Sequence, residues 1–317
     1  MAVIFVDTPG NRSLPPSFAL KAAAGESEFI SVTDIGAAIA AIESTEIVDA
    51  LVTNAPDTLL CKAFRQHHPD FPIILVTDQP MSEYSDALEG DEHLLVDHVI
   101  ANRTGMEWTV NELRSTLQKL LNKDIFGLEK YLAPGTVIQE ATITGSENRD
   151  LHNLAVMKFA QEHKLGQHMS KTIFGISEEL LMNAIYDAPV AGGSMSFDNI
   201  PRTAAVKLEP HQYATLRYGC DGNTFGIAVS DPFGALKREK LFQYLKKVLM
   251  RRDSTSLIDN KKGGAGLGIF KILYSSHALV CNVQPKRHTE FMALINVHDQ
   301  LRDFSKMARS IHYFEVS

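Results

Sequence analysis

The sequence is poor in the residues that mark secreted and metal-binding proteins. Its three cysteines, Cys61, Cys220 and Cys281, are far apart and form no Cys-x-x-Cys pair, so we expect reduced, structural thiols. The twelve histidines show no His-Glu-x-x-His spacing, which argues against a transition metal. No apolar run approaches the roughly 18 residues of a membrane span, and the apolar start reaches Asp7 too soon for a signal peptide. These absences predict a cytoplasmic protein without membrane insertion.

Charge is unevenly distributed along the 317 residues. Positions 1–120 carry 7 Lys and Arg against 18 Asp and Glu, whereas positions 121–317 carry 24 against 20. The chain exceeds one average domain, and the change in charge predicts two units that meet near residue 121. The basic stretch 237–262 contains only two aromatic residues, which argues against nucleic acid as a partner. A phosphorylated ligand would suit the basic second half equally well.

The first unit, residues 1–121, alternates short apolar runs with helical patterns. This β/α alternation predicts an open, mostly parallel sheet with helices on both faces, a flavodoxin-like, doubly wound α/β fold. The strand candidates are 3–6, 47–53, 72–77 and 98–101, and the helix candidates are 36–43, 58–66 and 108–121.

The order of these segments resembles the receiver domain of response regulators. In that family an aspartate at the end of the third strand accepts phosphate, assisted by an acidic pair and by a lysine after the fifth strand. Here Asn54 stands at the acceptor position, Asp7 is followed by Thr8, and Ala101-Asn102 stands where the lysine and proline would be. An amide is a poor nucleophile toward a phosphoryl group. The resemblance therefore implies a pseudo-receiver that binds something but does not take phosphate.

Two alternatives to the pseudo-receiver stay open at this stage. One is a flavodoxin-like domain that is unrelated to receivers. The other is a different strand register, in which Asp49 or Asp57 would supply the acceptor carboxylate. Asp49 would then have to end the third strand, whereas the apolar pattern places it near the start.

The second unit, residues 122–317, opens with a connector at 122–135, which is read as a short helix broken by Ala133-Pro134-Gly135. A strand is predicted over 136–144 and a helix over 151–162. Ser177 is the expected N-cap of a further helix, 178–188, which Pro189 would end.

Three polar residues of that helix, Glu179, Asn183 and Asp187, are spaced four apart. This spacing places them on one side of a helix. Asn and Asp have low helix propensity, which favours a functional role for the stripe. The alternative is a solvated helix face.

Two further segments complete the pattern. An apolar strand, 224–230, runs into Asp231, and a carboxylate at a strand end can accept a hydrogen bond from an exocyclic amine. The basic segment that follows is helical from 235 to 252, and then comes Gly-Gly-Ala-Gly-Leu-Gly at 263–268. Glycines there would permit close approach of the backbone to a phosphate.

Together these segments resemble the GHKL ATPase superfamily of gyrase, histidine kinases and anti-sigma kinases. Residues 179–187 resemble its N-box, 231–234 its first glycine box and 263–268 its second. The resemblance implies a Bergerat α/β sandwich that binds ATP and Mg²⁺, with Asn183 on the metal and Asp231 on the adenine amine. In the anti-sigma branch, Glu179 would be the catalytic general base. The other implied contacts to the cofactor are Asp187, Gly234, Lys262 (or Lys261) in a mobile lid over 237–262, Gly264, Gly266, Leu267 and Gly268.

The sequence departs from the GHKL pattern in its first glycine box, and it lacks the dimerisation hairpin of histidine kinases. Asp231-Pro232-Phe233-Gly234 supplies one glycine where the family has Asp-x-Gly-x-Gly. No dimerisation hairpin with an acceptor histidine precedes the N-box, and His152 is read as a surface residue. We expect an ATP-binding signalling protein that phosphorylates a partner on Ser or Thr, such as a sigma-factor regulator or another two-component protein. The alternatives are a non-catalytic interaction module and a DNA-associated ATPase, and both resembling families often form homodimers.

Overall fold

The computed structural model describes residues 2–55, 57–80, 96–103, 106–194, 200–249, 267–298 and 307–317. The chain divides into two compact units, Met1–Ile125 with Ser305–His312 and Phe126–Phe304 with Tyr313–Ser317. Residues 307–312, expected in the second unit, belong to the first, because Ile311 and His312 pair with Val99 and His98. The pairing of two strands so far apart in sequence cannot be predicted from the residues of either strand alone.

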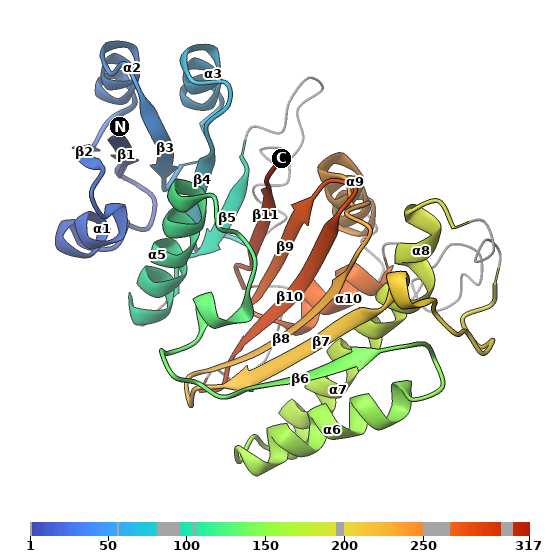
Figure 1. The fold of residues 1–317 in the computed structure, drawn as a ribbon. Coiled ribbons are helices and arrows are strands. Elements are labelled where there is room, and N and C mark those ends of the chain that lie inside the picture. The colour runs from blue at the N-terminus through green and yellow to red at the C-terminus, as the bar shows by residue number, and fades with distance from the viewer. Residues whose placement is uncertain are drawn as a thin grey trace. The chain divides into compact units, whose positions relative to one another are not determined.

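The first unit contains a parallel sheet in the order β2-β1-β3-β4-β5 (Figure 1). This is the flavodoxin-like strand order, and it confirms the predicted doubly wound parallel sheet. Strand β2, the edge strand, was not predicted because its half-exposed residues show no strong apolar pattern. The strands are β1 (Ala2–Val6), β2 (Glu28–Val32), β3 (Val48–Thr53), β4 (Ile73–Thr77), β5 (His98–Ala101) and, antiparallel to β5, the start of β11 (Ser310–Glu315).

Helices cover both faces of this sheet. On one face, Val3 and Phe5 of β1 pack in a core with α1 and α5, while α2 and α3 pack together on the other (Figure 1). Coverage of both faces explains why every residue of β1 is buried. The helices are α1 (Ser17–Ala24), which was not predicted, α2 (Ile35–Ser44), α3 (Thr58–His67) and α5 (Met106–Asn122).

The second unit contains an antiparallel sheet in the order β9-β10-β8-β7-β6. Its central strands β8 and β10 are almost fully buried, so the sheet is covered on both faces. The predicted strands at 136–144 and 224–231 are confirmed. The strands are β6 (Ile138–Ile143), β7 (Ala214–Cys220), β8 (Thr224–Asp231), β9 (Ala278–Gln284) and β10 (His288–Asn296).

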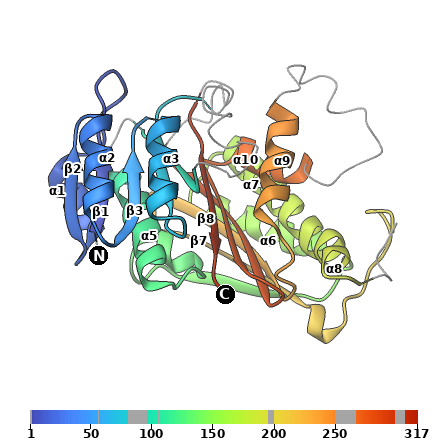
Figure 2. The same cartoon turned by 90° about the horizontal axis from the view of Figure 1, so that it is seen from above.

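Different elements pack against the two faces of this sheet, as two neighbouring residues of β8 show. Phe225 meets Phe159 of α6, and Figure 2 shows α6 and α7 on the same side of the strands. Gly226 points the opposite way, against Leu128 of the connector, since neighbouring strand residues face opposite sides. The helical elements are η2 (Leu128–Tyr131), α6 (Arg149–Glu162), α7 (Gln167–Met182), the π turn η3 (Asn183–Asp187), α8 (Ala188–Ala191), η5 (Pro210–Gln212), α9 (Arg238–Leu249) and α10 (Leu267–Ser275).

The connector is thus a packed part of the second unit. Its one helical turn is the short 3₁₀ segment η2, not a longer helix. The backbone N–H of Gly127 donates to the buried carboxylate of Glu290, which also accepts from Asn282. This carboxylate fixes the start of the connector against β10 and β9.

No helix in the described ranges combines the length and the apolar character that crossing a membrane requires. The three cysteines are free thiols, with Cys61 and Cys281 buried.

Candidate functional site

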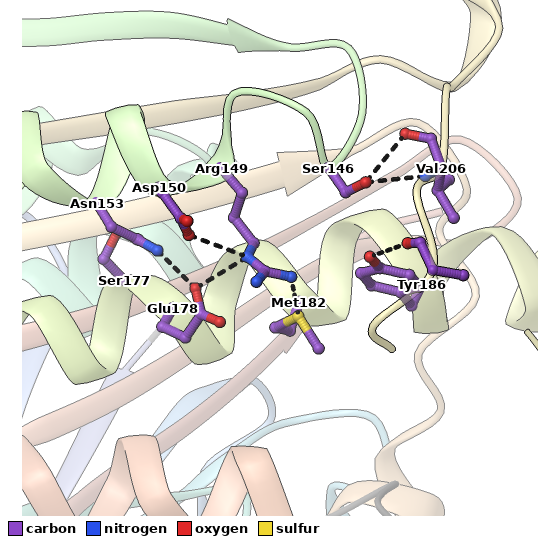
Figure 3. Close-up of polar contacts among 10 residues, drawn as sticks. Ser146, Arg149, Asp150, Asn153, Ser177, Glu178, Met182, Tyr186 and Val206 are labelled. Carbon is purple, nitrogen blue, oxygen red and sulfur yellow. Dashed lines mark hydrogen bonds and ion pairs between the residues drawn. The ribbon is translucent and has the colours of Figure 1, made fainter. Parts of the chain in front are cut away.

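Helix α7 carries Glu179 of the predicted polar stripe and begins at Gln167, eleven residues earlier than expected. Ser177 lies inside it, fully buried, and is not an N-cap. Its hydroxyl donates to Asn153 Oδ1 of α6 at 2.6 Å, and Asn153 Nδ2 donates to Glu178 (Figure 3). In the sequence, a serine followed by acidic residues looks the same whether it caps a helix or lies inside one and hydrogen-bonds to a neighbouring helix.

The two adjacent acids of α7 face different neighbours. Glu178 joins the α6 network, where its carboxylate lies 3.2 Å from Arg149 Nε (Figure 3). Glu179 faces α10 instead, and its Oε1 accepts from Lys271 Nζ at 2.6 Å. Adjacent helix residues point about 100° apart, so only Glu179 is placed on the side of Asn183.

The chain does not end its helix at Pro189. Asn183–Asp187 form a π turn, η3, which leads directly into α8 with Pro189 in its first turn. Proline is tolerated there because the first N–H groups of a helix have no intrahelical partner. Single π turns are often found at functional sites, and this one carries both Asn183 and Asp187. Tyr186 anchors the turn by donating from its hydroxyl to Ala204 O at 2.8 Å (Figure 3).

A pocket in the second unit unites three of the predicted residues, Asn183, Asp187 and Asp231. Its apolar walls include Leu180, Val229, Ile269 and Phe291, contributed by α7, β8, α10 and β10. An apolar pocket with a few convergent polar groups is the usual form of a small-molecule site.

Asp231 lies at the buried end of β8 and is 6% exposed. Burial raises its pKa to about 6, and the hydrogen bond that the Phe233 backbone N–H donates to its Oδ1 at 3.0 Å opposes that rise. Thr289 is its cross-strand partner on β10. At neutral pH the group is mostly a carboxylate, held in an environment that penalises its charge.

Asn183 and Asp187 differ in whether their polar atoms have hydrogen-bond or ion-pair partners. The Asn183 Nδ2 atom is buried and has no hydrogen-bond partner among the described residues. Asp187 pairs with Arg202 at 2.5 Å, although burial still raises its pKa. A buried amide without a partner costs free energy, and a ligand at this position would relieve that cost.

The described glycines of the predicted boxes have packing roles. Gly234 adopts φ +58°, and a Cβ there would lie 2.1 Å from Gln284 O in the β9–β10 turn. A Cβ on Gly268 would lie 2.8 Å from Glu179 Oε2 and 3.5 Å from Asn183 Oδ1. Gly268 thus lets α10 approach α7 closely and places Glu179 beside Asn183.

The remaining predicted contacts fall outside the described residues or differ from expectation. Lys261, Lys262, Gly264 and Gly266 lie outside the described ranges, and of Leu267 only the backbone is described. The described part of the expected lid is not a loose cover. It forms α9, whose Leu241, Phe242 and Leu245 are buried, because an amphipathic helix buries its apolar side.

Sequence reasoning missed several residues around the site. Thr289 is brought to Asp231 only by strand register, and Lys240 and Tyr244 line the pocket from α9. Arg202 and Lys271 hold the acids at the two ends of the stripe. No local signal distinguishes these residues from ordinary surface residues. Among the described residues there is no cluster of three or more His, Cys, Asp or Glu suited to a metal ion.

In the first unit, the side chain of Asn54, which follows β3, forms a hydrogen-bond network with Asp7 and Thr8, which follow β1. Asn54 Nδ2 donates to Asp7 Oδ1 at 2.7 Å and to Thr8 O, and Asn54 Oδ1 accepts from Thr8 N and Oγ1. Asp7 Oδ1 also accepts from the backbone N–H of Leu14. This network ties the strand ends to the β1–α1 loop.

The two carboxylates considered as alternative acceptors have other roles. Asp49 is the second residue of β3 and accepts from Ser27. Asp57 caps α3 by accepting from Leu60 N. The alternative register is therefore wrong.

No protein-family model matches the chain, and no curated protein matches it. Among solved structures, the chain is similar to a chain in the crystal structure of the SiaB-SiaC complex from Pseudomonas aeruginosa. The match has 13% identity and a TM-score of 0.33, and covers 49% of this chain and 88% of that one. A likeness at this level does not assign a function.

Proposed function

We propose that the second unit binds ATP with Mg²⁺ in the pocket between α7, β8 and α9. The observation that supports this most directly is that one apolar pocket holds the buried carboxylate of Asp231 and the half-buried Asn183, whose buried Nδ2 atom has no hydrogen-bond partner among the described residues. An apolar cavity accepts a flat base, and Asp231 would accept a hydrogen bond from its exocyclic amine. The proposal assigns this unit to the Bergerat fold of GHKL ATPases.

The metal would be held by few protein groups. Mg²⁺ prefers oxygen ligands and commonly takes most of them from phosphates and water. Asn183 supplies an amide oxygen beside Gly268, and Asp187 lines the same pocket. Mg²⁺ would therefore arrive with the triphosphate, which is consistent with the lack of an acidic cluster in the described residues.

Replacement of Asn183 by Ala tests the proposal. We expect the affinity for ATP in the presence of Mg²⁺ to fall at least tenfold, because the variant loses a metal ligand, while the weaker Mg²⁺-free binding changes little. Isothermal titration calorimetry with and without Mg²⁺ measures both. Asn148→Ala is the matched control, since Asn148 is exposed and its side chain makes no cap hydrogen bond. Equal, negligible binding by parent and variants would reject the proposal.

Group transfer is the second part of the proposal. Glu179 would take the proton from a Ser or Thr hydroxyl of a partner protein as that oxygen attacks the γ-phosphorus. The bond to the β-phosphate oxygen would break, with ADP leaving. The partner would be a signalling protein, such as a sigma-factor regulator.

A non-catalytic binding module is the second candidate, and one observation favours it. The Glu179 Oε1 atom accepts a hydrogen bond from Lys271 Nζ, and the nearby ammonium charge makes this carboxylate a weaker base toward a hydroxyl proton. Incubation with radiolabelled ATP and a cell extract separates the candidates. Binding without label transfer, in both the parent and Glu179→Gln, would support the module.

The first unit would act as a regulator that does not accept phosphate. Its acceptor position holds Asn54, whose amide group is fully engaged in hydrogen bonds. The proposed control therefore depends on binding and not on phosphorylation. Incubation with acetyl phosphate and Mg²⁺ should leave the intact mass unchanged, and a gain of one phosphoryl group on this unit would contradict it.

A further inference from the structure

The basic side chains around the pocket differ in whether they already hold an acid. Arg202 pairs with Asp187 at 2.5 Å, and Lys271 pairs with Glu179 at 2.6 Å. Lys240 lines the same pocket from α9, yet in the described parts of the chain no carboxylate lies within ion-pair distance of its ammonium group. A positive charge in a pocket, without an acidic partner among the described residues, is available to an anionic ligand.

Helix α9 fixes where that charge lies. Leu241 and Leu245, each of which directly follows a pocket-lining residue, are buried, so this part of α9 is anchored in the unit. One turn from Lys240, Tyr244 also lines the pocket, and the Lys240 Nζ atom lies 5.8 Å from the centre of its ring. The aromatic ring supports the ammonium group through a cation–π contact.

Arg202 keeps Lys240 available. Lys240 is close enough to Asp187 to lower the pKa of that carboxyl group, but the contacts from Arg202 have the larger effect. Because Arg202 neutralises Asp187, the acid has less attraction for the Lys240 ammonium group. Without Arg202, Asp187 would compete with any anionic ligand for Lys240.

We propose that Lys240, supported by Tyr244 and kept free by Arg202, binds an anionic phosphate group of the ligand in this pocket. The inference rests on the proposed function and narrows it, since the site would select phosphorylated nucleotides over nucleosides. Lys240 and Tyr244 are ligand-binding residues in this account, and Arg202 is a positioning residue that acts through Asp187.

Binding measurements on Lys240→Met test the assignment. We expect its affinity for Mg²⁺-ATP to fall about tenfold, as for the loss of one charge-assisted contact at a partly exposed site. Its affinity for adenosine should stay within about twofold, because adenosine has no anionic group. Lys237→Met is the matched control, since Lys237 is exposed and does not line the pocket, and should leave both affinities unchanged. Tyr244→Ala should weaken both ligands, whereas Tyr244→Phe should retain both.

The positioning role of Arg202 has its own readout. Arg202→Gln should weaken Mg²⁺-ATP binding, whereas Arg202→Lys, which keeps a positive charge beside Asp187, should retain it. If Arg202 acted only by stabilising the fold, the folded Arg202→Gln variant would bind Mg²⁺-ATP as tightly as the parent does. Circular dichroism of each variant establishes that the chain is folded.

Inorganic pyrophosphate separates failure of this inference from failure of the proposed function. Lys240-dependent binding of pyrophosphate by a parent protein that binds no nucleotide would reject ATP as the ligand and retain the anion site. Parent-like Mg²⁺-ATP affinity in Lys240→Met would overturn the anion site and leave nucleotide binding intact. A parent that binds none of the three probes would overturn both.

Discussion

Replacing Asp231 with Asn should stabilise the ligand-free protein and impair its proposed function. Burial raises the pKa of Asp231 to about 6, whereas an unfolded aspartate has a pKa of about 3.9. At pH 7 the folded chain therefore carries a buried charge that the unfolded chain carries in water. The neutral amide avoids this penalty, so the free energy of unfolding at pH 7 should rise by roughly 2 kcal/mol.

The pH dependence has a definite sign. The folded state binds a proton at Asp231 more tightly than the unfolded state does, so this group adds stability at low pH. That contribution is lost as pH rises from about 4 through 6. Asp231→Asn should lack this dependence, and calorimetric unfolding at a series of pH values measures it. Asp150→Asn is the control, because the Asp150 side chain is 84% exposed and its loss should leave the pH dependence unchanged.

The same substitution should weaken ATP binding at least tenfold, because an amide can present an N–H group where the base amine needs an acceptor. In the parent, the affinity should decline as pH falls below about 6 and the carboxylate becomes protonated. Functional groups that cost stability are typical of binding sites. An Asp231→Asn variant that is less stable than the parent and binds ATP equally well would reject this account of the residue.

Replacing Asn54 with Asp should destabilise the first unit strongly. The new carboxylate would lie where Asn54 Nδ2 now donates to Asp7 Oδ1 at 2.7 Å and to Thr8 O. A buried carboxylate at position 54 would then face the half-buried carboxylate of Asp7 and the donor bonds would be lost, for a cost of about 3 kcal/mol at pH 7. The only tryptophan of the chain, Trp108, lies in α5 of this unit, so its fluorescence during urea unfolding reports the change.

The reverse exchange in the same unit provides the control. Asp57→Asn keeps an oxygen that can accept from Leu60 N, and Asn caps helices as well as Asp does. Its effect should stay within about 0.5 kcal/mol. An Asn54→Asp variant with the urea midpoint of the parent would show that the amide network does not hold the loop as described.

Local sequence patterns determined most elements of this fold. Four of the five parallel strands and three of their helices were predicted, because buried strands and amphipathic helices each repeat within a few residues. The four-residue spacing of Glu179, Asn183 and Asp187 was found for the same reason, although the structure places Asn183 and Asp187 in the π turn that follows α7. Elements with weak patterns, α1 and β2, were missed.

Only the tertiary structure showed which residues from distant segments lie close together. Strand register places Thr289 opposite Asp231, and packing of α9 and α10 brings Lys240 to the pocket and Lys271 to Glu179. The start of β11 joins the first unit by pairing with β5. Such contacts depend on the free energy of burying whole elements against each other, so no short stretch of sequence contains them. The sequence identified Asn183 and Asp231 separately, and only the folded chain places them in one pocket.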